Sequence, residues 1–125
     1  MAEILIIDDE PQMRRLLTRL LSGAGHTVRE ATNGKDGIEL FGGARPALVI
    51  TDIVMPGIEG LELIRELRHK DPGVPILAIS GGGHPVYLRA ATGLGATAAL
   101  AKPFGSDELL SAVAGLLGGT TSELK

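Results

Sequence analysis

The chain has 125 residues and no cysteine, and 12 basic residues stand against 15 acidic ones, which gives a formal net charge of −3. That length predicts one domain that buries its own core. The missing thiols exclude disulfides, cysteine nucleophiles and thiolate metal sites. The sequence has no basic run typical of a nucleic-acid binder and no apolar run long enough for a membrane span or a signal peptide. We therefore expect a cytoplasmic protein that binds neither nucleic acid nor membrane.

Five short apolar segments along the chain predict β-strands. The first is rich in isoleucine and too short for a helix. The second alternates apolar and polar residues, as a half-buried strand does. The five predicted strands are Glu3–Asp8, His26–Ala31, Ala47–Thr51, Pro75–Ser80 and Thr97–Ala101.

A helical pattern follows each predicted strand. Pro11 suits the first turn of the first helix, which has one leucine-rich face. We expect Ser106 to be the N-cap of the last helix, and Gly118 and Gly119 to end it. The three helices between are predicted at Gly34–Phe41, Gly60–Lys70 and His84–Gly93.

This alternation is typical of a doubly wound α/β fold, in which helices cover both faces of a parallel sheet. We expect one domain over residues 1–119 and a frayed tail over residues 120–125. Ligands of such sheets bind beyond the carboxyl ends of the strands. The polar residues at those ends are therefore the candidates for chemistry.

Charged or hydroxyl-bearing residues stand at the ends of four predicted strands. These residues are Asp8 and Asp9, Asp52, Ser80 and Lys102, in strand order one, three, four and five. If the four strands are neighbours, three carboxylates, a hydroxyl and an ammonium converge in one shallow pocket. Crowded carboxylates repel each other and need positive charge. One lysine supplies part of it, and Mg²⁺ fits best because it accepts a few carboxylates together with water and phosphate oxygens.

This set of residues suits phosphoryl transfer. Asp52 has no acidic neighbour in the chain and is the expected nucleophile, which would form an aspartyl phosphate. Asp8 and Asp9 form a pair suited to the metal. Lys102 would neutralise charge on the phosphoryl oxygens, and Ser80 would donate a hydrogen bond to one of them.

Each of these residues also has an ordinary explanation. Asp8 and Asp9 could cap the following helix, and Ser80 could satisfy a local backbone group. Lys102 could be a solvated surface lysine. Their shared place at one edge of the sheet favours the functional interpretation.

Four motifs, in order, resemble the receiver domain of two-component response regulators. They are IIDDE (Ile6–Glu10), TDIVMPGIEG (Thr51–Gly60), AIS (Ala78–Ser80) and AKPF (Ala101–Phe104). The resemblance extends over the whole chain. It implies a flavodoxin-like sheet of five parallel strands in the order 2-1-3-4-5.

The resemblance also implies the metal ligands. Asp52 matches the phosphoacceptor, which is also a metal ligand in the family. Asp9 matches the residue that binds Mg²⁺ directly, and Asp8 matches the one that acts mainly through a metal-bound water. The backbone carbonyl of Val54 matches a further ligand.

Two more residues occupy positions whose side chains contact the phosphoryl group in the family. Ser80 matches the hydroxyl that moves onto this group, and Lys102 matches the invariant lysine. The bond between Lys102 and Pro103 is cis in the family.

The resemblance implies that a phosphohistidine of a sensor histidine kinase or a histidine phosphotransfer protein donates the phosphoryl group. The domain would catalyse only its own phosphorylation and dephosphorylation, so it is not expected to be an enzyme. Downstream proteins would contact the face of the fourth helix, fifth strand and fifth helix. We expect a stand-alone receiver that is a monomer or a weak homodimer.

The sequence departs from the family at two positions and leaves two alternatives open. Ala99 stands where the family has an aromatic switch residue, and Gly81 replaces the usual alanine after Ser80. One alternative is a receiver-like binding module that is never phosphorylated. The other is an aspartate-nucleophile phosphatase, but Val54 occupies the position of its general acid.

Overall fold

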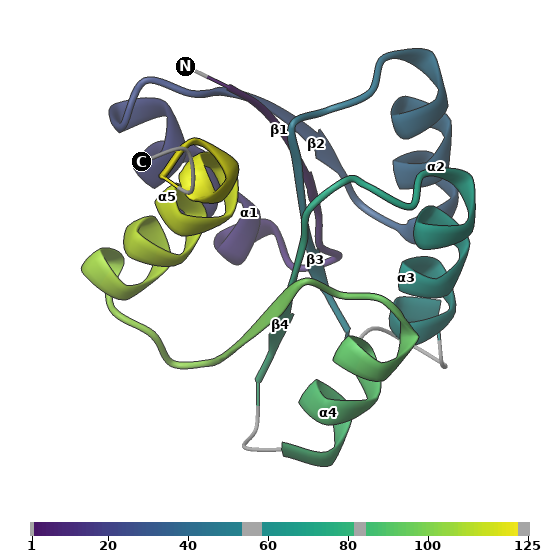
Figure 1. The fold of residues 1–125 in the computed structure, drawn as a ribbon. Coiled ribbons are helices and arrows are strands. Elements are labelled where there is room, and N and C mark those ends of the chain that lie inside the picture. Colours follow the sequence, from purple (N-terminus) through teal and green to yellow (C-terminus); the bar gives the residue numbers. More distant parts are fainter. Residues whose placement is uncertain (1, 54–58, 82–84, 123–125) are drawn as a thin grey trace.

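The structure is a computed structural model that describes residues 2–53, 59–81 and 85–122. Over these residues the chain forms one parallel sheet whose strands alternate with helices (Figure 1). The strands are β1 (Glu3–Ile7), β2 (Thr27–Ala31), β3 (Leu48–Asp52), β4 (Ile76–Ser80) and β5 (Ala98–Ala101). The helices are α1 (Pro11–Gly23), α2 (Gly34–Gly43), α3 (Glu59–Lys70), α4 (Pro85–Leu94) and α5 (Ser106–Ser122).

The strand order is β2-β1-β3-β4-β5, so the predicted doubly wound fold is confirmed. Helices α1 and α5 cover one face of the sheet, and α2, α3 and α4 cover the other (Figure 1). A hydrophobic core lies on each face of the sheet, and alternate residues of β1 contribute to one core or the other. The reason is that successive side chains of a strand point to opposite faces. Ile4 and Ile6 pack toward α1 and α5, whereas Leu5 and Ile7 pack toward α2 and α3.

The central strands β3 and β4 are buried along their whole length. That is expected of strands covered by helices on both faces, and it explains their nearly continuous apolar sequences. The register places Asp52 opposite Ile79, and Ser80 opposite Ala101. The carboxyl ends of β3, β4 and β5 therefore lie at one edge of the sheet.

The last helix begins at Ser106 as predicted, but its predicted N-cap and its predicted end were wrong. The carbonyl of Gly105 accepts the first helical bond, from the N–H of Leu109 at 3.0 Å, so Gly105 rather than Ser106 is the N-cap. Helix α5 also continues through Gly118 and Gly119 to Ser122. A glycine costs a helix about 1 kcal/mol relative to alanine, which weakens a helix without ending it. Of the predicted tail, residues 123–125 lie outside the described residues.

Smaller differences affect the other elements. Strand β3 includes Asp52, which was predicted to follow the strand. Proline occupies the first turn of α1 as predicted.

Among the described residues, no helix is long and apolar enough to cross a bilayer.

Candidate functional site

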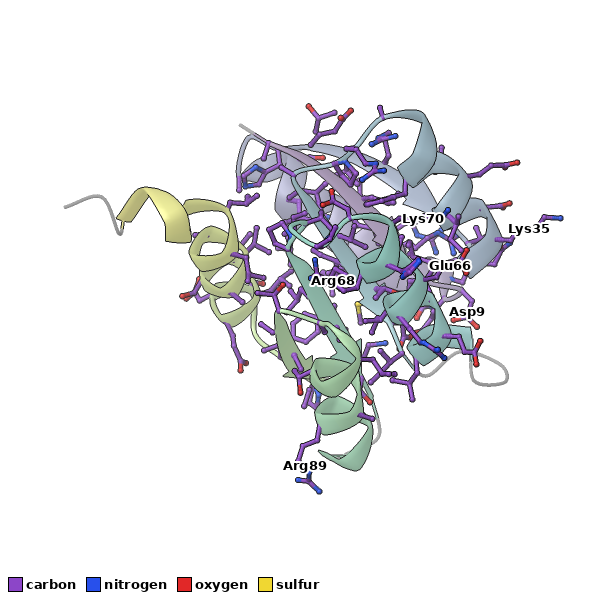
Figure 2. The ribbon with its side chains drawn as sticks, turned by 45° about the vertical axis from the view of Figure 1, so that its right-hand side comes forward. Asp9, Lys35, Glu66, Arg68, Lys70 and Arg89 are labelled. Carbon is purple, nitrogen blue, oxygen red and sulfur yellow. The ribbon has the colours of Figure 1, made fainter. Side chains whose placement is uncertain are left out.

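Three carboxylates meet at the carboxyl edge of the sheet. Asp8 and Asp9 follow β1, and Asp52 ends β3, which pairs with β1. Each of the three contributes one carboxylate oxygen to a group whose members lie within 4.8 Å of one another. Asp8 and Asp52 are 1% and 5% exposed, whereas Asp9 lies at the surface (Figure 2). The predicted convergence of these three side chains is confirmed.

The backbone and one carboxylate oxygen of Asp8 are held in place. Its N–H donates to the carbonyl of Ala31 at 3.1 Å, and its Oδ1 accepts the N–H of Glu10 at 2.9 Å. Its other oxygen, Oδ2, is buried and has no hydrogen-bond partner among the described residues. A buried carboxylate oxygen without a partner is costly and calls for a cation or a proton.

The environment of Asp8 raises its pKa from 3.8 to about 6. Burial is the largest cause, since it disfavours the charged form. The N–H of Glu10 and the ammonium of Lys102 lower the pKa, whereas the negative charges of Asp52 and Asp9 raise it. The carboxylate thus lacks enough compensating positive charge from the protein alone.

Lys102 brings positive charge to the pocket. Its Nζ donates to Asp52 Oδ2 at 3.2 Å and lies 3.8 Å from Glu10 Oε1. Its side chain is 17% exposed. Its own N–H donates to the carbonyl of Ser80 at 2.7 Å, which fixes the backbone from which the side chain extends. The bond to Pro103 is cis, as predicted.

Gly81 leaves room for this lysine. A Cβ atom at Gly81 would lie 3.3 Å from Lys102 Cδ, which is closer than ordinary van der Waals contact. The absence of a side chain at this position therefore lets the lysine stem lie against the β4 end. This departure from the family has a local steric effect.

Ser80 lies at the end of β4 and is 1% exposed. Its hydroxyl donates to the carbonyl of Gly81 at 3.3 Å. This is the local backbone contact that the sequence analysis gave as a non-functional reason for the serine. A rotation about χ1 would free the hydroxyl for another acceptor. Val54, the predicted carbonyl ligand, lies outside the described residues, so the structure leaves that prediction untested.

Ala99, at the position of the usual aromatic switch, is half-buried and packs against the core between the sheet and α2–α4. The one tyrosine of the chain, Tyr87, belongs to α4 instead, and its side chain lies outside the described part of the chain.

Sequence reasoning missed two residues near the carboxylates. Glu10 contributes its N–H to Asp8 and its carboxylate to Lys102. Arg14 donates from Nη1 to the carbonyl of Asp8 at 2.8 Å. Glu10 lies within the IIDDE motif, and Arg14 is one helical turn beyond it, but their contacts become visible only in three dimensions.

The three carboxylates could hold a metal cation. Among the described residues, three carboxylates lie beside the ammonium of Lys102, and a buried oxygen of Asp8 has no partner. Mg²⁺ binds through one or two carboxylates together with water and phosphate oxygens. Asp8, Asp9 and Asp52 are the residues that would hold it.

The model of the response regulator receiver domain family matches residues 4–114. The response regulator MprA of Mycolicibacterium vanbaalenii is 36% identical over 120 residues, which cover 96% of this chain and 52% of MprA. This chain therefore spans about half the length of that relative.

Solved structures agree with this match. NtrX from Brucella abortus superimposes with a TM-score of 0.92 at 31% identity, over 98% of this chain and 28% of NtrX. The chemotaxis protein CheY4 of Vibrio cholerae superimposes with a TM-score of 0.86 at 29% identity, over 94% of this chain and 99% of CheY4. Sequence motifs, strand order and site geometry lead to the same conclusion: the chain belongs to the receiver domain family of the response regulators of two-component signalling.

Proposed function

We propose that the domain accepts a phosphoryl group on Asp52, from a phosphohistidine of a sensor kinase or a phosphotransfer protein, at a site that binds Mg²⁺. The observation that carries this proposal is the 3.2 Å contact between Lys102 Nζ and Asp52 Oδ2. A nucleophilic carboxylate beside a fixed cation is the arrangement that phosphoryl transfer needs, since negative charge accumulates on the transferred oxygens.

The reaction begins with attack of an Asp52 carboxylate oxygen on the phosphorus atom. The phosphorus–nitrogen bond breaks, and the imidazole of the donor leaves and takes up a proton. Lys102 stays within reach of the phosphoryl oxygens, and the hydroxyl of Ser80 rotates from the carbonyl of Gly81 to donate to one of them. When bound, Mg²⁺ neutralises charge on those oxygens and helps to align donor and acceptor.

Asp8 and Asp9 hold the metal in this proposal. Asp8 contributes through the buried oxygen that has no partner among the described residues, and Asp9 contributes from the open side of the pocket. The family resemblance adds the carbonyl of Val54. Because Val54 replaces the general acid of aspartate-nucleophile phosphatases, we propose that the domain catalyses only its own phosphorylation and dephosphorylation.

The phosphorylated domain signals through protein contacts or passes the phosphoryl group onward. The proposed contact face consists of α4, β5 and α5. Ala99 lies on β5 within that face, so the signal passes without an aromatic side chain at this position.

Beryllofluoride, which binds to a carboxylate as a mimic of its phosphorylated form, tests the proposal without a kinase. We expect the amide NMR signals of Asp52, Ser80 and Lys102 to shift further when beryllofluoride is added to protein that already contains Mg²⁺, and not to shift when beryllofluoride is added without Mg²⁺. The matched variant Asp52→Asn should show no such shifts. Equal shifts in both proteins would place the binding elsewhere and overturn the proposal.

A further inference from the structure

Arg14 lies one turn into α1, close to the loop that carries Asp8 and Asp9. Its side chain is 16% exposed, which is unusual burial for an arginine on a surface helix. The neighbouring Arg15, in contrast, is exposed. Arg14 is therefore held by contacts inside the fold rather than being a solvated charge.

The guanidinium of Arg14 has two partners from different elements. Nη1 donates to the backbone carbonyl of Asp8 at 2.8 Å. Nε lies 3.4 Å from Oε1 of Glu30 on β2. The arginine thus connects three segments: helix α1, the residue that follows β1, and the edge strand β2.

These contacts complete the restraint of Asp8. Its N–H is bound to Ala31 of β2, its carbonyl to Arg14 and its Oδ1 to the N–H of Glu10. The N–H of Arg14 in turn donates to the carbonyl of Glu10 at 3.1 Å, so the helix start and the acidic loop form one hydrogen-bonded unit. No group of the described residues forms a hydrogen bond with Oδ2 of Asp8, so this oxygen remains available to a ligand.

We infer that Arg14 is a positioning residue for the metal site: it fixes the backbone of Asp8 so that the carboxylate is preorganised for Mg²⁺. This inference rests on the proposed function, since it assumes that Mg²⁺ is the ligand of the three carboxylates. A loop whose adjacent carboxylates repel each other opens more easily once the carbonyl of Asp8 loses its partner. The guanidinium contacts the carbonyl of Asp8 and not its carboxylate, so the role we assign to Arg14 is to hold the backbone rather than to bind the metal.

The test is direct Mg²⁺ binding, measured by titration of amide NMR signals in the unphosphorylated protein. We expect Arg14→Met to raise the dissociation constant for Mg²⁺ by about 10-fold, the low end of what loss of an outer partner costs a metal site. The matched control is Arg15→Met, which removes the same charge from the adjacent exposed position and should leave the constant within twofold of wild type.

A second readout separates positioning from a general loss of structure. For Arg14→Met, phosphorylation by acetyl phosphate should need about 10-fold more Mg²⁺ for half its maximal rate, while the rate at saturating Mg²⁺ stays within about threefold. A residue that only stabilises the fold would lower Tm and leave the Mg²⁺ dependence unchanged. Arg14→Lys keeps one donor and should give an intermediate dissociation constant.

Three outcomes decide the inference. An unchanged Mg²⁺ constant in folded Arg14→Met would overturn it. If that variant does not fold, Glu30→Gln, which weakens the other contact of the guanidinium, should raise the constant severalfold, and an unchanged constant there would likewise overturn it. A wild-type domain that binds no Mg²⁺ would overturn the metal part of the proposed function, and the inference with it.

Discussion

Nζ of Lys102 lies 3.2 Å from Oδ2 of Asp52, although the two residues are 50 positions apart and β4 lies between their strands. The lysine side chain crosses the end of β4, beside Gly81, to reach the carboxylate. This contact places positive charge beside an aspartate that is 5% exposed. It is the physical basis for expecting Asp52 to react with a phosphoryl donor.

Replacement of the lysine tests its role in that reaction. Lys102→Met should slow phosphorylation by acetyl phosphate by about 100-fold, because one preorganised donor to the charged oxygens is lost. The rate is measured by intact mass against time at saturating Mg²⁺. Lys70→Met, on the exposed end of α3 (Figure 2), is the matched control and should react like wild type. A rate for Lys102→Met within twofold of wild type would refute the role.

The raised pKa of Asp8 predicts how stability depends on pH without metal. The folded-state pKa, about 6, exceeds the unfolded value of 3.8, so the folded state binds the proton more tightly. Ionisation of this carboxylate therefore lowers the free energy of unfolding. The loss is negligible below pH 3.8, grows between pH 4 and 6, and is complete above pH 6.

Asp8→Asn should remove this cost. In EDTA, the variant should be more stable than wild type at pH 7.5, by on the order of 1 kcal/mol after allowance for solvent screening, and should differ little at pH 4. Urea unfolding at both pH values measures the difference. Glu39→Gln on the exposed face of α2 serves as the control. Equal stability gains for Asp8→Asn at both pH values would contradict the assigned cause.

Magnesium affinity should also depend on the protonation of Asp8, but it should increase as the pH rises, whereas stability without metal decreases. Protonation of Asp8 removes a ligand charge, so Mg²⁺ and the proton compete. With a pKa of about 6, the apparent dissociation constant should rise about 10-fold between pH 7.5 and pH 5. Calorimetric titrations at the two pH values measure it. In Asp8→Asn the constant should be higher at pH 7.5 and depend less on pH; an equally steep dependence would mean that another group competes with the metal.

The hydroxyl of Ser80 should matter for the reaction and not for the metal. Its contact is the carbonyl of Gly81 rather than a carboxylate. Ser80→Ala should slow phosphorylation by on the order of 10-fold, since one hydrogen bond to the phosphoryl group is lost, while Mg²⁺ affinity stays within twofold. Ser80→Thr retains the hydroxyl and should react at a rate near that of wild type. A large loss of Mg²⁺ affinity in Ser80→Ala would show that the serine supports the metal site instead.

The fold class could be predicted from the sequence because it depends on periodic patterns, whereas the strand order and the roles of the site residues came from the family resemblance. Alternating strands and helices lead to a parallel sheet, and such a sheet brings the strand ends to one edge. With the strand order that the resemblance implied, Asp8, Asp52 and Lys102 could be grouped before their contacts were known. The N-cap at Gly105 was missed because serine has the stronger intrinsic preference, whereas the cap is set by where the helical bonds begin.

The contacts of Glu10 and Arg14 could not be predicted in the same way. They depend on how α1 leaves β1 and on where a long side chain folds back, and neither has a periodic pattern. Two glycines in α5 misled the prediction of its end, because a glycine costs a helix only about 1 kcal/mol relative to alanine and does not by itself end it.

The most direct test of the central claim is the intact mass of the domain after incubation with acetyl phosphate and Mg²⁺. We predict that wild type gains one phosphoryl group, that the gain disappears with EDTA, and that Asp52→Asn gains none. The same added mass in Asp52→Asn, or no added mass in wild type together with no binding of beryllofluoride, would contradict the claim that Asp52 is the phosphoacceptor.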